Sequence, residues 1–175
     1  MTRALFYALL LLPVIALAQH QPYAGQQDRE IKALSPDEVK QYLSGAGMGF
    51  ARPAELNRFP GPMHVLELAD KLELTQEQRV RTRALMDAHK AEARAIGAKR
   101  VESERVIEAL FRSGNLDAAA LAEGVREAAA LEGEYRLSHL ETHRRMRVLL
   151  TEEQVAHYVH LRGYGTMATS HGSKH

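Results

Sequence analysis

The chain has no cysteine and no tryptophan among its 175 residues, and only 6% of its residues are aromatic. The lack of cysteine excludes disulfides, thiolate metal sites, a cysteine nucleophile and a lipid-modified cysteine anchor. An excess of one charge is also missing, because 23 basic side chains stand against 22 acidic ones. This balance and the shortage of stacking aromatics argue against a nucleic-acid binder. Alanine, leucine, glutamate and arginine are abundant instead, and they favour helices over a sheet sandwich.

The start of the chain has the features of a secretory signal. One basic residue, Arg3, precedes an apolar run over residues 4–17, and Ala16 and Ala18 stand just before Gln19. A basic start, an apolar core and small residues at the −3 and −1 positions are typical of a cleaved signal peptide. The sequence therefore predicts export with cleavage after Ala18, and an uncleaved membrane anchor is the alternative. Cleavage would leave 22 basic and 22 acidic side chains, since Arg3 is the only charged residue removed.

Helix start and stop signals organise the next part of the chain. Ser35, followed by a proline and by Glu38 three residues on, predicts a helix that ends near Gly45. Residues 19–34 are polar and without periodicity, which indicates a flexible lead-in. Glycines and prolines dominate the stretch after the helix, and a further short helix is predicted over residues 63–72.

Two long helices are predicted beyond this point. Thr75 and Gln78 form a capping box at the start of the first helix, which meets no proline and ends near Ser113. The second runs from residue 115 or 117 to about Leu149. Each is roughly 50 Å long at about 1.5 Å per residue. Two such helices joined by a short turn form an antiparallel hairpin.

These signals predict an all-α protein. A last short helix follows Thr151, and the polar C-terminus is predicted to be disordered. The predicted organisation is a signal peptide at 1–18, a lead-in with one short helix and a Pro/Gly-rich loop at 19–62, a helical hairpin domain at 63–165, and a tail at 166–175.

The first long helix carries two apolar faces. One is an alanine-rich stripe whose small side chains favour close contact with the second helix: Val80, Ala84, Ala88, Ala91, Ala95, Ala98, Val106 and Ala109. The other is a patch of larger side chains: Leu85, Ile96, Ile107, Leu110 and Phe111. A single hairpin covers one of these faces, so we expect the other to contact the short helices, a second subunit or another protein.

A short motif occurs twice: one copy opens the first long helix and the other follows the second. The two copies of Leu-Thr-x-x-Gln comprise Leu74, Thr75 and Gln78, and Leu150, Thr151 and Gln154. Each copy alone is a capping box preceded by leucine. Two copies that bracket a helical hairpin behind a signal peptide resemble the Spy/CpxP family of periplasmic proteins and their relatives, the heavy-metal sensor and resistance proteins of the CnrX and ZraP type. The resemblance covers roughly residues 63–163.

The resemblance implies a hairpin subunit that pairs into a cradle-like homodimer. It also implies an ATP-independent chaperone, or holdase, whose surface binds unfolded or misfolded periplasmic proteins. Apolar side chains mixed with flexible cations can bind many sequences weakly. The candidate client-binding residues are the apolar Leu85, Ile96, Ile107, Leu110 and Phe111 and the cationic Arg83, Arg94 and Arg100.

Histidines on the second long helix indicate an alternative function, metal binding. His139, His143 and Met146 lie at i, i+4 and i+7 on one face, where they could bind a divalent transition metal such as Zn, Ni, Co or Cu. His64, His89 or Glu132 could complete the ligand set. The alternative is a polar layer of hydrogen-bonded imidazoles in a helix interface.

No catalytic motif is present, so we expect a protein that is not an enzyme. The sequence favours a periplasmic holdase that acts under envelope stress without a required cofactor. The alternatives are a periplasmic metal sensor or metal-binding resistance protein, and an adaptor that docks on an inner-membrane stress- or metal-signalling protein.

Overall fold

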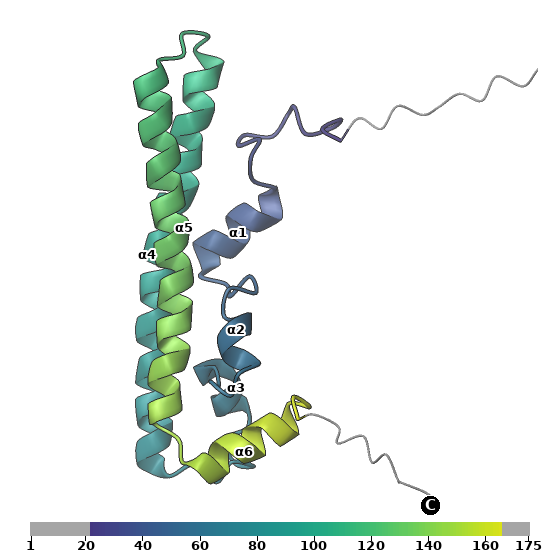
Figure 1. Cartoon of the computed structure of the whole chain (residues 1–175), viewed down its shortest axis with the longest axis vertical. Helices are drawn as coiled ribbons and strands as arrows, with labels where there is room; N and C mark the ends of the chain where they lie inside the picture. The colour runs from purple at the N-terminus through teal and green to yellow at the C-terminus, as the bar shows by residue number, and fades with distance from the viewer. Residues whose placement is uncertain (1–21, 166–175) are drawn as a thin grey trace, which may run out of the picture.

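The computed structural model describes residues 22–165, and within this range it contains helices and turns but no strand. The signal-peptide prediction and the predicted tail lie outside the described residues. Two long antiparallel helices, α4 (Gln76–Arg112) and α5 (Ala118–Val148), lie side by side along the long axis (Figure 1). The predicted hairpin is confirmed. Asp117 caps α5 by accepting a hydrogen bond from the Ala120 amide at 2.7 Å.

Four short helices accompany the hairpin. α1 (Pro36–Ser44), α2 (Arg52–Glu55) and α3 (Pro62–Glu67) follow one another along one side of it, and α6 (Glu152–Leu161) crosses its open end (Figure 1). The four-residue α2 was not predicted. α3 is shorter than the predicted helix over 63–72, because the chain turns after Glu67 and Glu73 adopts a left-handed conformation with φ 51°.

The contact between α1 and α4 depends on a glycine. α1 has the predicted capping box of Ser35 and Glu38, and it ends at Gly45, whose φ is 71°. Its last turn lies directly against Gly97 of α4. A Cβ at Gly97 would lie 2.1 Å from the carbonyl oxygen of Tyr42, so only glycine allows this approach.

The segment before α1 is part of the packed structure. Ile31 and Leu34 are buried in the same apolar cluster as Tyr42 and Tyr135, so the prediction of a flexible lead-in is wrong for this part of the chain. Ion pairs fix it to α4 as well, among them one of 2.5 Å between Lys32 and Glu108. A second apolar cluster joins α3, α4, α5 and α6 at the open end of the hairpin.

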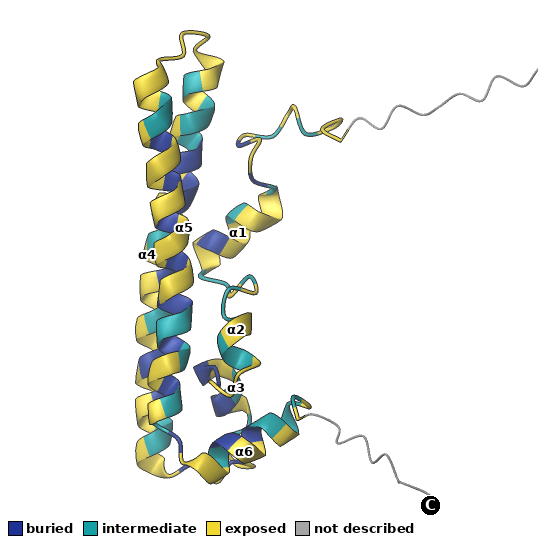
Figure 2. Ribbon diagram, viewed as in Figure 1, coloured by how far each residue is buried: buried dark blue, intermediate teal, exposed yellow. Residues whose placement is uncertain are grey.

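The predicted role of the alanine-rich stripe is wrong. All eight of its residues are exposed, whereas α4 packs on α5 and the short helices through a different face that includes Leu85, Ala93, Gly97 and Val101. Figure 2 shows exposed and buried positions interspersed along both long helices. Both faces contain small residues, and the short helices select the buried one because they extend the contact made by α5. We call the exposed residues Val80, Ala84, Ala88, Ala91, Ala95, Ala98, Val106 and Ala109 the outer strip.

None of the described helices is both long and apolar enough to cross a membrane.

Candidate functional site

The two Leu-Thr-x-x-Gln motifs begin α4 and α6. Thr75 accepts a hydrogen bond from the Gln78 amide at 3.1 Å, and the Gln78 side chain accepts one from the Thr75 amide at 3.0 Å. Thr151 and Gln154 repeat this arrangement at 3.2 and 3.0 Å. Both predicted capping boxes are therefore present in full.

The two motifs also bind each other, which the sequence analysis did not predict. The side-chain nitrogen of Gln78 donates to the side-chain oxygen of Gln154 at 2.8 Å and to the Leu149 carbonyl at 2.9 Å. Gln154 returns the arrangement, donating to the Gln78 oxygen at 3.0 Å and to the Leu72 carbonyl at 3.2 Å. Each amide thus makes two donor and two acceptor contacts, its full capacity. We call this pair the glutamine clasp.

The motif leucines support the clasp from the apolar side. Leu74 and Leu150 are buried in one cluster with Leu85, Met146 and Val155. The repeated motif therefore joins the start of α4 to the start of α6 through both hydrogen bonds and apolar packing, and it closes the open end of the hairpin.

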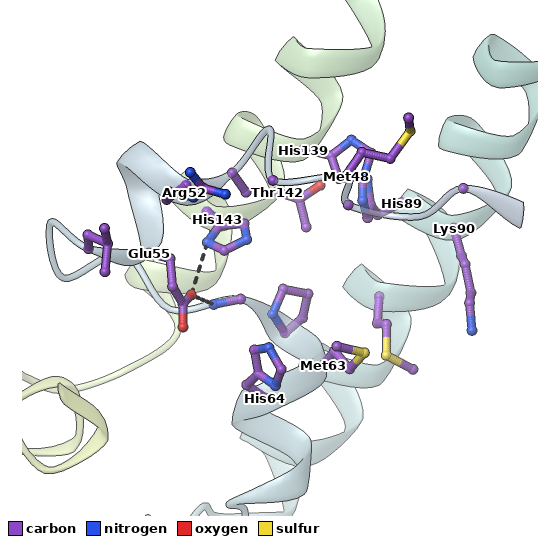
Figure 3. A pocket seen from close by; sticks show the side chains of 18 of the residues that line it. Met48, Arg52, Glu55, Met63, His64, His89, Lys90, His139, Thr142 and His143 are labelled. Carbon is purple, nitrogen blue, oxygen red and sulfur yellow. Dashed lines mark hydrogen bonds and ion pairs between the residues drawn. The ribbon is translucent and has the colours of Figure 1, made fainter. Parts of the chain in front are cut away.

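A cavity of about 720 Å³ lies between the hairpin and the short helices. Its walls come from the loop after α1, from α2, from the start of α3, from the middle of α4 and α5, and from the end of α6 (Figure 3). Soft and basic side chains are concentrated in it. They are the imidazoles of His64, His89, His139 and His143 and the thioethers of Met48, Met63 and Met86.

Each of three histidines has one ring nitrogen engaged. The Nδ1 of His139 donates to the Tyr135 carbonyl at 2.9 Å, and that of His143 donates to the Phe59 carbonyl at 2.7 Å. The Nδ1 of His64 lies 2.8 Å from a carboxylate oxygen of Glu67 on its own helix. Contacts of this kind fix the orientation of an imidazole ring.

His89 and His139 form a close pair across the hairpin. Their ring centroids are 4.5 Å apart and the ring planes meet at 86°. Burial lowers the pKa of both, to about 4 for His89, and the proximity of His139 adds to the effect on His89. Both rings are therefore neutral near pH 7.

Glu55 joins the elements around the other end of the cavity. Its carboxylate accepts hydrogen bonds from the Tyr158 hydroxyl at 2.5 Å and the Gly61 amide at 3.2 Å. It also lies 3.6 Å from His143 and 3.6 Å from Arg162. One carboxylate thus ties α2 to α3, α5 and α6, and burial together with this contact raises the pKa of Tyr158.

The structure separates the predicted metal ligands. His139 and His143 line the cavity, but Met146 is fully buried in the apolar cluster beneath α6 and does not reach it. Within residues 22–165, no three histidine, aspartate or glutamate side chains converge well enough to hold a metal ion. Met48, Met86 and Glu55 were not among the predicted site residues, because nothing in the spacing of the chain connects them to the histidines.

The client-binding candidates are dispersed. Leu85 is buried in the core, and Arg100 is buried in an ion pair with Glu104 at 2.6 Å, so neither belongs to the surface of the subunit. Ile107 and Phe111 line a groove of about 420 Å³ near the hairpin turn. The other four are half-buried or exposed: Ile96, Leu110, Arg83 and Arg94.

This protein is therefore of the helical-hairpin class: paired capping motifs close the hairpin, and a cavity lies between it and the short helices. Residues 62–162 match the family described as LTXXQ motif family protein. The chain belongs to this family, which comprises Spy/CpxP-type proteins and is a family of chaperones and sensors rather than enzymes. No curated protein and no solved structure matches the chain.

Proposed function

We propose that the protein is an exported, ATP-independent chaperone that binds unfolded or misfolded envelope proteins on the outer surface of its hairpin. The observation that carries this proposal is the exposure of the outer strip, in which Val80 and Val106 are 58% and 47% exposed. The strip runs along most of α4, a helix of about 55 Å at about 1.5 Å per residue. Exposed apolar side chains gathered along one helix face favour an interaction site, and Glu102 divides this strip between Ala98 and Val106.

Cations accompany the strip. At 100° per residue, Arg81 and Lys99 flank it on one side and Arg83 and Arg94 on the other. Near the open end it continues into a groove of about 480 Å³, where Ala84 and Val148 lie between arginines of both long helices. A shallow surface of small apolar side chains and mobile cations suits weak binding of many sequences, because no single geometry is required.

Suppression of aggregation tests the proposal. The mature protein, without ATP, should keep a chemically reduced client protein in solution at a near-stoichiometric ratio. Ala91→Glu combined with Ala95→Glu places two charges in the outer strip, at positions that are exposed in the subunit. We expect this variant to lose most of the activity while it keeps the helix content of the wild type in circular dichroism. Ala130→Glu, at an exposed site on α5, is the matched control and should retain full activity. Equal activity of all three proteins would exclude the outer strip as the binding surface.

A second function, periplasmic metal sensing or metal scavenging, is favoured by a different observation. Four imidazoles line the cavity, and one ring nitrogen in each of two of them, the Nδ1 of His89 and the Nε2 of His139, is buried without a hydrogen-bond partner. Calorimetric titration with Zn, Ni, Co and Cu tests this function, with His139→Ala and His143→Ala as variants. We expect binding to the mature protein and its loss in the double variant. Retained affinity would assign the metal to another part of the chain.

A further inference from the structure

The Nε2 of His139 is a buried ring nitrogen that lacks a partner. The residue is 5% exposed, and its Nδ1 donates to the Tyr135 carbonyl, so Nε2 carries a lone pair. Backbone groups of Gly45 and Ala46 lie near the ring, but none is within hydrogen-bonding geometry of Nε2.

The Nδ1 of His89 is a second nitrogen in the same condition. It belongs to the other arm of the hairpin, and its ring meets that of His139 at a centroid distance of 4.5 Å. A buried polar atom without a hydrogen-bond partner destabilises a folded protein. Two such atoms on facing rings indicate a site that a ligand completes.

Two thioethers, those of Met48 and Met86, line the same cavity as this pair. Met86 lies one helical turn before His89 on α4, and both residues line the cavity. Met48 lies beside His89 and His139 in the loop after α1 (Figure 3). The close approach of this loop is seen at Gly47, where a Cβ would lie 3.9 Å from Cδ2 of His139.

The donor set discriminates between metals. Zn, Ni and Co prefer several imidazole or carboxylate ligands, and no three such side chains converge within the described part of the chain. Glu55, a half-buried carboxylate of the cavity, already accepts hydrogen bonds from Tyr158 and Gly61. Two imidazoles and two thioethers are soft, uncharged donors, and thioether ligands select Cu(I).

We infer that this cavity binds a soft monovalent cation, Cu(I) or its analogue Ag(I), through the imidazoles of His89 and His139 and the thioethers of Met48 and Met86. The inference rests on the second proposed function, metal binding in the cavity, and specifies its metal and its ligands. Thioether and imidazole donors avoid the disulfides that thiolate ligands would form in an oxidising compartment.

A competition titration tests the inference. The mature protein would be titrated anaerobically with Cu(I) against a chromogenic Cu(I) chelator, and separately with Ag(I) and Zn(II). We expect one tightly bound equivalent of Cu(I), which Ag(I) displaces, and much weaker binding of Zn(II). Met48→Leu combined with Met86→Leu preserves side-chain volume and helix content, and it should lower the Cu(I) affinity at least tenfold. Met63→Leu, which removes an exposed thioether of the same cavity, is the matched control and should change nothing.

The outcomes separate the two proposals. Equal Cu(I) affinity in the wild type and the double methionine variant, with both folded by circular dichroism, would overturn the inference. Tight Zn(II) binding without Cu(I) binding would also overturn it but leave metal binding as a function. If neither metal binds, both proposals fail. Replacement of His171 and His175 by glutamine identifies any binding by the C-terminus, and we expect these substitutions to leave the tight site intact.

Discussion

At the scale of single residues, Gln78 and Gln154 each perform two tasks with one amide. The side-chain oxygen completes the capping box of its own helix, and the same amide bonds to the other motif 76 residues away. The sequence predicts the first task because a capping box is local in the chain. The second depends on where the two helix starts meet in space, so spacing alone does not predict it.

The glutamine clasp predicts that two substitutions in the same motif lower the free energy of unfolding by different amounts. Thr75→Ala removes one cap and should lower the free energy of unfolding by about 1 kcal/mol. Gln78→Ala also removes one donor and one acceptor contact of the Gln154 amide and the side-chain partner of the Leu149 carbonyl, so we expect a loss of about 2–3 kcal/mol. Urea denaturation measures both values.

Two further variants complete this comparison. Gln76→Ala removes an exposed glutamine of the same helical turn and should cost almost nothing. Because the two glutamines share one network, the double variant Gln78→Ala with Gln154→Ala should cost less than the sum of the single changes. Strict additivity would contradict the clasp.

The histidine pair predicts a loss of stability in acid. The pKa of His89 in the folded protein is about 4, and that of His139 is also lowered. An unfolded chain takes up these protons near the ordinary pKa of about 6.5, so it binds more protons than the folded chain between about pH 6.5 and 4. The free energy of unfolding should therefore fall as the pH falls through this range. His89→Gln should show a shallower fall in urea midpoints at pH 7, 6 and 5. His157→Gln, on the exposed side of α6, should behave as the wild type does, and an identical slope for all three proteins would contradict the assignment.

At the scale of helices, the ends were predictable and the contacting faces were not. Caps at Ser35, Thr75 and Thr151 were read correctly because each needs only residues three positions apart. The face through which α4 packs could not be predicted in this way. A helical projection shows two faces with small residues, and it does not include α1 or α3. Gly97 determines which face of α4 is buried, because it allows α1 to approach, and it lies outside the predicted alanine-rich stripe.

Two glycine substitutions test this account of helix packing. In a helix, alanine is favoured over glycine by about 1 kcal/mol, so Gly→Ala stabilises wherever there is room. At Gly133 of α5 nothing lies within 4 Å of the added Cβ, and we expect a gain approaching that value. At Gly97 the new Cβ would meet the Tyr42 carbonyl at 2.1 Å, so α1 must move away and stability should fall. Thermal unfolding shows whether each substitution raises or lowers the melting temperature. A stabilised Gly97→Ala protein would disprove the close contact.

At the scale of the whole molecule, the cavity is the feature that the sequence predicted least. His139 and His143 were recognised because they are one helical turn apart on a regular helix. The residues that surround them come from several segments, and Met48 and Glu55 lie in a stretch without helical periodicity. Local rules describe such a stretch only as a loop, so its contribution to a site becomes visible when the short helices are placed against the hairpin.

The outer strip predicts the assembly of the whole protein. Eight exposed apolar positions on one helix favour burial against a second copy, so we expect the mature chain to sediment as a dimer. Two charges introduced by Ala91→Glu and Ala95→Glu would have to be desolvated in that interface, which should shift the protein to monomers at micromolar concentration. Ala130→Glu on α5 should remain dimeric. Because clients are proposed to bind the same strip, addition of a reduced client should also lower the dimer fraction of the wild type. A wild-type monomer at all concentrations, or a dimer that persists in the strip variant, would mean that the outer strip is not the surface on which two copies meet.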